Sequence, residues 1–267
     1  MSKFNIRRLS YGGLMTALVF TTTAIIPQIP IPFTEGYIHT GDSMIFVTSI
    51  LLGWKYGLIA GGIGSAMADL FLGYAHWAFP TLIIKGIMGA IVGLMAQDVK
   101  EKRLKILVKI IGYAVAIGWV ILAIYLKKVL SNISNELSDS EIINSLVDKL
   151  SLNGIEHLER LINSVQMSLV LAIMIIPIFT IVLSIILRKR DKELFSVNSL
   201  MGMTLAGLWM VSGYYVAGGI LKGNMIVPIF SVPANVIQFI GGEIVAFPIV
   251  LALKKANVNK MLSSRLN

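Results

Sequence analysis

The sequence predicts an all-α integral membrane protein, and three observations predict this together: composition, the spacing of apolar segments and the placement of charges. Of the 267 residues, 56% are hydrophobic and 14% are charged, whereas a soluble domain has about 45–50% and about 25%. The mean hydropathy is +0.80. Cysteine is absent, which excludes a disulfide scaffold and cysteine-based metal or redox sites.

Apolar segments follow one another along the chain, separated by short charged clusters. A helix needs about 20 apolar residues to cross the hydrocarbon of a bilayer, and most of these segments reach that length. The second segment is shorter. The expected spans are 9–29, 43–54, 56–75, 79–97, 106–126, 164–187, 198–220 and 230–253.

The basic residues give the expected orientation. With the N-terminus in the cytoplasm, most of the 23 lysines and arginines fall in cytoplasmic loops, as the positive-inside rule requires. This bias holds only if the short 43–54 segment crosses the membrane, which puts both termini in the cytoplasm. The net charge is +9, and the placement of the charges indicates a multi-pass protein of the cell membrane. We therefore expect the lipid bilayer to be its partner, and we do not expect it to bind nucleic acid.

Three regions of the chain differ in amino-acid composition. Residues 1–97 and 197–267 combine glycine with polar residues inside apolar spans, whereas 98–196 holds two plain aliphatic spans joined by a polar outer segment. Apolar residues at helical spacing in that segment predict an extracellular helical hairpin, with a second short helix that begins at Asn153. We expect 98–196 to be an insert between two parts of a core.

Ionisable and amide side chains inside spans are costly and are candidate functional groups. Asp69 and Lys85 lie in the third and fourth spans at similar expected depth, which allows an ion pair between them. The pair either ties two helices together or lines a cavity open to the outside. Asn235 and Gln238 share one stripe of the last span and offer hydrogen bonds to a ligand or to another helix. Glu243 lies off that stripe, and its role stays open.

Aromatic and polar residues gather at the expected outer face. Glu35, Tyr37 and His39 precede the second span, and Trp77 begins the fourth. Aromatic residues at a membrane edge are commonly interface anchors. The alternative is a lid and stacking surface for a planar heterocycle.

Small residues form close-packing patterns. Glycines crowd the third and fourth spans, where they allow helices to approach one another. Gly13 and Ala17 lie four apart on the first span, where they fit internal packing or docking against another membrane protein equally well.

Common catalytic and nucleotide-binding motifs are missing. The sequence contains no G-x-x-x-x-G-K-[ST] phosphate loop, no H-E-x-x-H and no G-x-S-x-G. We therefore expect a non-enzymatic protein without a cofactor or a metal site.

Several runs carry a family resemblance. They are 36–42, 51–53, 60–69, 77–78 and 81–86, with 233–238 and 241–242 in the tail. These runs resemble the substrate-binding S component of energy-coupling factor (ECF) transporters, and the resemblance covers about 7–97 and 197–255. The first run is the more specific.

The resemblance implies a compact six-helix core that captures a vitamin or a vitamin precursor from outside the cell. A transmembrane coupling subunit and two ATPase subunits then drive uptake, and a small-residue pattern that maps onto Gly13 and Ala17 docks on the coupling subunit. We expect a substrate like pyridoxine or hydroxymethylpyrimidine first and riboflavin second. The expected pocket residues are Asp69, Lys85, Asn235 and Gln238, with Glu35, Tyr37, His39 and Trp77 as gate or stacking residues.

Two other classes stay open. A self-contained secondary transporter would use Asp69 or Glu243 as its proton site. A membrane enzyme acting on lipid or prenyl substrates would lose turnover on neutralisation of Asp69, whereas a binding subunit would lose ligand affinity.

Overall fold

A computed structural model describes residues 6–30, 37–96, 102–135, 140–190 and 196–256, and these are almost entirely helical. A short antiparallel pair of strands, β1 (Ile29–Pro30) and β2 (Tyr37–Ile38), follows the first helix. The helices are α1 (Ile6–Ala24), α2 (Gly41–Leu52), α3 (Trp54–Phe71), α4 (Ala75–Ala96), α5 (Lys102–Asn135), α6 (Ser140–Lys149), α7 (Ile155–Arg190), α8 (Val197–Lys222), the 3-10 helix η1 (Val227–Ser231) and α9 (Val232–Lys255). The all-α fold predicted from the sequence is confirmed.

Each of the eight expected spans coincides with a helix, and the protein is a multi-pass membrane protein. Among the described residues, five helical segments are long and apolar enough to cross a bilayer; they lie in α4, α5, α7, α8 and η1–α9. The helix α2 is apolar but has only 12 residues. Threonines in α1 and glycines in α3 lower the hydropathy of these helices, so the crossings of α1, α2 and α3 stay predictions.

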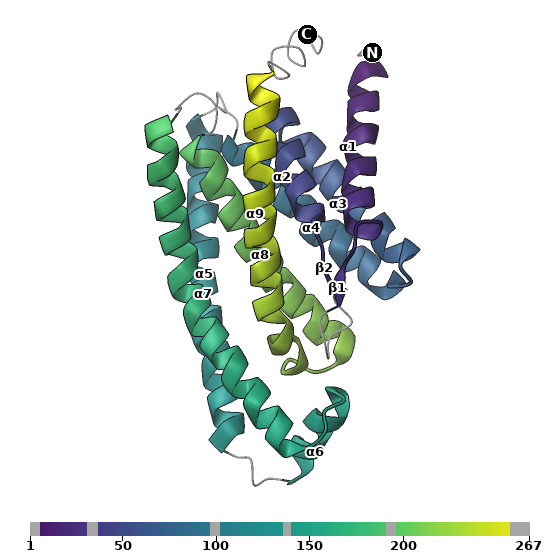
Figure 1. Cartoon of the computed structure of the whole chain (residues 1–267), viewed down its shortest axis with the longest axis vertical. Helices are drawn as coiled ribbons and strands as arrows, with labels where there is room; N and C mark the ends of the chain where they lie inside the picture. The colour runs from purple at the N-terminus through teal and green to yellow at the C-terminus, as the bar shows by residue number, and fades with distance from the viewer. Residues whose placement is uncertain (1–5, 31–36, 97–101, 136–139, 191–195, 257–267) are drawn as a thin grey trace.

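Glycines join α3 to α4, as the sequence predicts. A Cβ atom on Gly89 would lie 2.2 Å from the carbonyl oxygen of Gly57, and one on Gly61 would lie 2.7 Å from the carbonyl oxygen of Lys85. Only glycine permits backbones this close. The helix α3 also packs on α1, α8 packs on α4, and α9 packs on α2 and α8 (Figure 1). These six helices, α1 to α4 with α8 and α9, form the core bundle.

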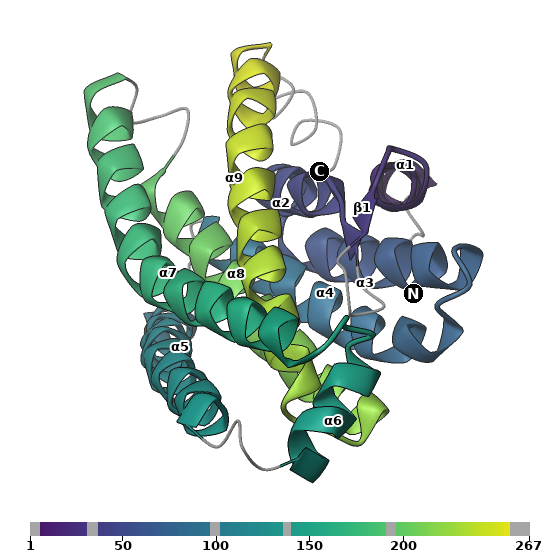
Figure 2. The same ribbon diagram turned by 60° about the horizontal axis from the view of Figure 1, so that its bottom comes forward.

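The helices α5 and α7 lie side by side along one flank of the core bundle, and α6 lies at their far end (Figures 1 and 2). With 34 and 36 residues, α5 and α7 are each about 50 Å long and exceed the roughly 30 Å hydrocarbon thickness. The predicted separate helix from Asn153 is wrong, because α7 runs without a break from Ile155. No glycine or proline interrupts residues 155–176.

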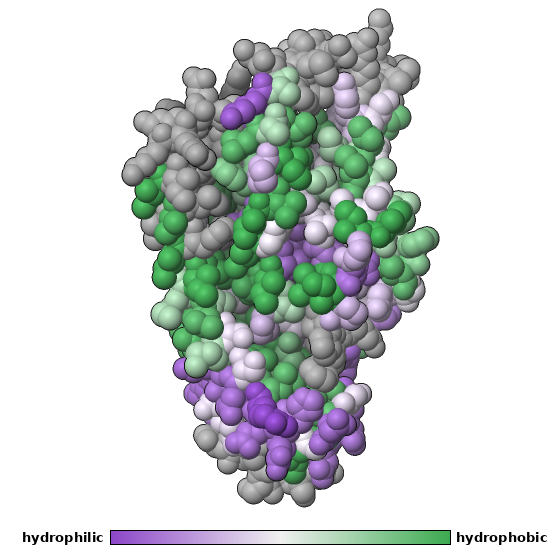
Figure 3. Space-filling view, viewed as in Figure 1, coloured by the Kyte–Doolittle hydropathy of each residue, from purple (hydrophilic) through white to green (hydrophobic). Residues whose placement is uncertain are grey.

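The surface divides along the long axis. Hydrophilic residues gather at the end that carries α6, whereas apolar residues cover the flank formed by α7 and α9 (Figure 3). The first turn of α1 and the last turn of α9 lie at the opposite end from α6 (Figure 1). This arrangement fits an even number of crossings, and the cytoplasmic assignment of that end stays a prediction.

Candidate substrate-binding site

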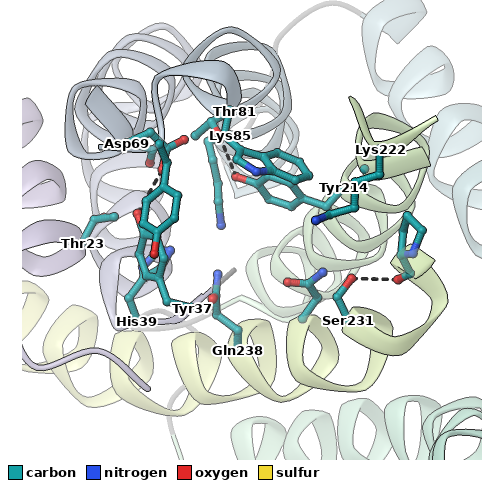
Figure 4. Close-up of a pocket in the computed structure, with 16 residues that line it drawn as sticks. Thr23, Tyr37, His39, Asp69, Thr81, Lys85, Tyr214, Lys222, Ser231 and Gln238 are labelled. Atoms are coloured by element: carbon teal, nitrogen blue, oxygen red, sulfur yellow. Dashed lines mark hydrogen bonds between the residues drawn. The ribbon is translucent and has the colours of Figure 1, made fainter. Parts of the chain in front are cut away.

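A cavity opens inside the core bundle, between the β2–α2 segment, α3, α4, α8, η1 and α9 (Figure 4). The space measures about 720 Å³, its open mouth included, which is within the usual range for small-molecule sites. It is lined by Thr23, Tyr37, His39, Ser65, Asp69, Tyr74, Trp77, Thr81, Lys85, Tyr214, Gly218, Lys222, Pro228, Ser231, Asn235 and Gln238.

Seven of the residues selected from the sequence lie in this wall. They come from four parts of the chain and are Tyr37, His39, Asp69, Trp77, Lys85, Asn235 and Gln238. Glu35 lies outside the described residues. The structure therefore brings together side chains that are up to about two hundred positions apart in the sequence, and their binding role is taken up below as a proposal.

The floor of the cavity is a buried polar network. The Lys85 Nζ atom donates to Asp42 Oδ1 and also to the Met210 sulfur at 2.8 Å. The Gln238 Nε2 atom donates to Asp42 Oδ2 at 3.0 Å. Asp42 thus accepts from both cavity residues, one on α4 and one on α9, and holds their polar ends in place.

The Asp69–Lys85 ion pair that the sequence allows is not formed in the described structure, where the salt-bridge partner of Lys85 is Asp42. The cause is depth. Lys85 is ten residues into α4, about 15 Å along the helix axis, whereas Asp69 lies within about 3 Å of the end of α3. The two residues do not share the depth that the span boundaries suggested.

Asp42 enters the bundle because α2 begins earlier than expected, at Gly41. A carboxylate in the first turn of a helix is stabilised by the backbone N–H groups of that end. On α9, Gly242 faces this turn, and a Cβ atom there would lie 3.0 Å from the Asp42 Cβ atom. This close approach allows Gln238, one turn away on α9, to reach Asp42.

Asp69 lies at the opposite side of the cavity with Tyr37. The Tyr37 hydroxyl donates to Asp69 Oδ1 at 3.0 Å. Burial raises the pKa of the Tyr37 phenol, and the Asp69 charge raises it further, so Tyr37 stays a donor at physiological pH. The Tyr37 ring also packs against Tyr74, with ring centres 5.5 Å apart, and against His39 at 5.3 Å.

His39 is held as a neutral ring. Its Nδ1 atom accepts a hydrogen bond of 3.0 Å from the Gly41 N–H, which leaves the proton on Nε2. Although the ring is partly exposed, the protein packed around it lowers its pKa from 6.5 to about 4; Asp42 opposes this shift and Lys85 adds to it. His39 therefore offers an N–H donor at neutral pH.

A second aromatic pair forms the far wall. The ring centres of Trp77 and Tyr214 lie 6.0 Å apart, and the Tyr214 hydroxyl shares a 3.1 Å hydrogen bond with Thr81. The Lys85 Nζ atom lies 5.5 Å from the centre of the Tyr214 ring. Figure 4 shows Tyr37 and Tyr214 across the cavity from each other. Two aromatic walls and a charged floor suit a flat ring with polar edges.

Sequence reasoning missed several lining residues for a physical reason. Thr23, Ser65 and Thr81 carry hydroxyl groups, which helices tolerate by bonding to the preceding turn, as Thr48 and Ser49 do. A hydroxyl in a span therefore gives little signal. Glu243 gave a strong signal, yet it is fully buried on α9 away from the cavity wall.

The fold and the cavity define a class of protein, namely a helical membrane protein with an internal cavity of the size of a small-molecule site. The sequence profile described as "ECF-type riboflavin transporter, S component" matches residues 3–178 and 165–255. The chain therefore belongs to this family of S components.

Three individual relatives match parts of the chain. The thiamine precursor transporter HmpT of Lactococcus lactis is 32% identical over 119 residues, which cover 44% of this chain and 71% of HmpT. An uncharacterised protein of Pyrococcus woesei is 47% identical over 77 residues, or 29% of this chain and 51% of that protein. A UPF0397 protein of Streptococcus pneumoniae is 33% identical over 98 residues, or 37% and 52%. The chain thus spans about half of the last two relatives. No solved structure matches the chain.

Proposed function

We propose that this chain is the substrate-capture subunit of an ECF-type ABC importer, and that it binds a vitamin or vitamin precursor from outside the cell. The observation that carries the proposal is the cavity, in which aromatic walls enclose a charged and amide-bearing floor. A ring of the size of pyridoxine or hydroxymethylpyrimidine is the first candidate and riboflavin the second. The name of the HmpT relative supports the first candidate, and that of the family supports the second.

Each polar group of the wall has a role in this proposal. Tyr37, Tyr74, Trp77 and Tyr214 stack on the ring, and Asp69, Lys85, Asn235 and Gln238 bind its polar edge. His39 donates a hydrogen bond to the ligand from its Nε2 atom. Glu35, whose position precedes β2, is proposed as a gate residue on its place in the sequence alone.

Energy for uptake comes from other subunits. The chain has no phosphate loop, so a transmembrane coupling subunit and two ATPases are its proposed partners. Gly13 and Ala17 lie exposed on the same face of α1, and no atom lies within 4 Å of a Cβ atom built on Gly13. This open face is the proposed docking surface, on a chain whose termini are both cytoplasmic.

Binding by the chain alone tests the proposal. The purified chain in lipid nanodiscs is titrated calorimetrically with hydroxymethylpyrimidine, pyridoxine and riboflavin, and one of these binds with one-to-one stoichiometry. Lys85→Met with Gln238→Leu, which removes two polar groups of the floor, weakens that binding. Absence of binding by all three compounds contradicts the proposed substrate class.

Transport by reconstituted vesicles separates the proposal from its main rival. A secondary transporter would protonate Asp69 or the buried Glu243 and would accumulate the vitamin under a proton gradient with no other subunit present. The S-component assignment predicts uptake only when the coupling subunit, both ATPases and ATP are added. Gradient-driven uptake by this chain alone would overturn it.

A further inference from the structure

Buried polar atoms without a hydrogen-bond partner in the described structure gather around the cavity. Four of the eight such atoms belong to cavity residues, and all four come from α1, α3 and α4. They are Thr23 Oγ1, Ser65 Oγ, Asp69 Oδ2 and Trp77 Nε1. Buried polar groups normally have partners, so a set of unpartnered atoms around one cavity indicates where a bound molecule supplies them.

The chemistry of the two strongest groups specifies what the molecule offers. An ionised carboxylate only accepts hydrogen bonds, and an indole N–H only donates. A ligand that forms hydrogen bonds with both groups therefore places a donor at Asp69 and an acceptor at Trp77. The hydroxyls of Thr23 and Ser65 adapt to either group, so they do not discriminate between ligands.

Asp69 is fixed in the orientation that this selection requires. Its Oδ1 atom accepts from Tyr37 at 3.0 Å, and Figure 4 shows the carboxylate between Tyr37 and Thr81 at the edge of the cavity. Asp69 is only 6% exposed. A ligand that turned a carbonyl or ether oxygen toward Oδ2 would leave a carboxylate oxygen both buried and repelled.

Two other polar residues of the cavity already have partners. The Tyr214 hydroxyl shares a hydrogen bond with Thr81, and the Gln238 Nε2 atom donates to Asp42. The unpartnered buried polar atoms of the cavity thus belong to Thr23, Ser65, Asp69 and Trp77. These atoms discriminate among ligands whose polar edge also meets Lys85, Asn235 and Gln238.

Resting on the proposed function, we infer that Asp69 is the specificity-determining residue of the cavity, and that it selects heteroaromatic rings whose edge carries an amino group or a ring N–H. The same ring presents an acceptor to the Trp77 N–H. This requirement divides the candidate substrates. An aminopyrimidine and the imide-bearing ring of riboflavin meet it through a nitrogen donor, whereas pyridoxine with an uncharged ring nitrogen offers only hydroxyl donors.

Matched ligand pairs test the inference on the full chain in nanodiscs. One pair is hydroxymethyl-aminopyrimidine and the analogue with a methyl group in place of the amino group; the other is riboflavin and riboflavin methylated at its imide nitrogen. In each pair the second compound lacks the donor at the tested position. For at least one pair, the first compound binds at least about tenfold more tightly than the second, because loss of a hydrogen bond to a buried charge has about that effect.

The variant Asp69→Asn tests whether Asp69 causes the difference in affinity between the two members of a pair. An amide presents either an oxygen or an NH₂ group, so the variant should bind the two members of the pair within about threefold of each other. Met67→Leu is the matched control, because Met67 lies on α3 two residues away and is half exposed on the outer surface; it should retain the full preference. A merely structural role for Asp69 would weaken both compounds equally and would leave their ratio unchanged.

The outcomes separate this inference from the proposed function. Equal affinity within each pair for the unaltered chain, or tighter binding of the compound without the donor, overturns the inference while the binding function stands. Binding of pyridoxine with no binding of the other two compounds also overturns the inference while the binding function stands. An unchanged ratio in Asp69→Asn also overturns the inference. Failure of all ring compounds to bind overturns both proposals. If Asp69→Asn does not fold, the comparison within the pair on the unaltered chain still decides.

Discussion

The core bundle and the α5–α7 flank bury different kinds of residues. The core encloses Asp42, Asp69, Lys85 and Gln238 around a cavity, whereas the buried residues of the flank are almost all aliphatic, such as Leu126, Leu150 and Leu158. Among the described residues of 102–190, none lines the cavity. Buried charge thus marks the region for which we propose binding, whereas the flank buries hydrocarbon without buried charge among its described residues.

The largest expected effect follows from breaking the charged floor. Asp42→Ala leaves Lys85 buried without its counterion, which costs about 3–5 kcal/mol, and it frees the Gln238 amide. We expect a marked fall in unfolding stability in detergent and loss of ligand binding. Asp42→Ala with Lys85→Met should recover part of the stability but not the binding. Asp148→Ala, at an exposed position of α6, should change stability by less than about 0.5 kcal/mol.

An aliphatic substitution in the flank should separate stability from binding. Leu158 is fully buried, and replacement of a buried leucine by alanine costs about 2–5 kcal/mol. In Leu158→Ala we expect faster amide hydrogen exchange in α6 and the first turns of α7, with ligand affinity unchanged. A loss of affinity as large as that of Asp42→Ala would mean that the flank takes part in the site.

Two glycines sharpen the same contrast. Gly89→Ala would force α3 and α4 apart, because its Cβ atom meets the Gly57 backbone at 2.2 Å; lower stability and weaker binding should follow. Gly118 on α5 has no atom within 4 Å of a built Cβ atom. Gly118→Ala should therefore be neutral or stabilise the helix by up to about 1 kcal/mol. Equal thermal shifts in the two variants would contradict the described α3–α4 packing.

The smallest expected effect concerns pH. His39 has a pKa near 4 in the folded protein against 6.5 for the free side chain. The unfolded chain therefore takes up a proton first, so the contribution of His39 to stability is unaffected above pH 6.5 and falls as the pH drops from 6.5 toward 4. The groups around its ring are Asp42, Lys85 and Tyr37. With ¹⁵N-labelled histidine, the His39 signal should stay that of a neutral ring at pH 5; a protonated signal there would contradict the described environment.

The sequence predicted most of the helices and several residues of the cavity lining, because the signals behind them are local. Apolar length defines spans, and a charge or an amide inside a span is rare enough to stand out, as Lys85 and Gln238 do. Partner choice is not local. The pairing of Lys85 with Asp42 depends on where α2 begins and on how closely Gly242 lets α9 approach. The continuity of α7 was missed because polar residues near its start resemble a helix boundary.

Native mass spectrometry of the chain, extracted from membranes under mild conditions, tests most directly whether the cavity is the binding site. Gly218 lines the cavity, and a built Cβ atom there lies 3.4 Å from the Trp77 ring, so Gly218→Leu places a side chain in the space proposed for the ligand. We expect one small heterocyclic molecule on each unaltered chain and none on the variant. Unaltered chains that carry no small molecule after incubation with the candidate vitamins, or equal occupancy of both proteins, would contradict the account.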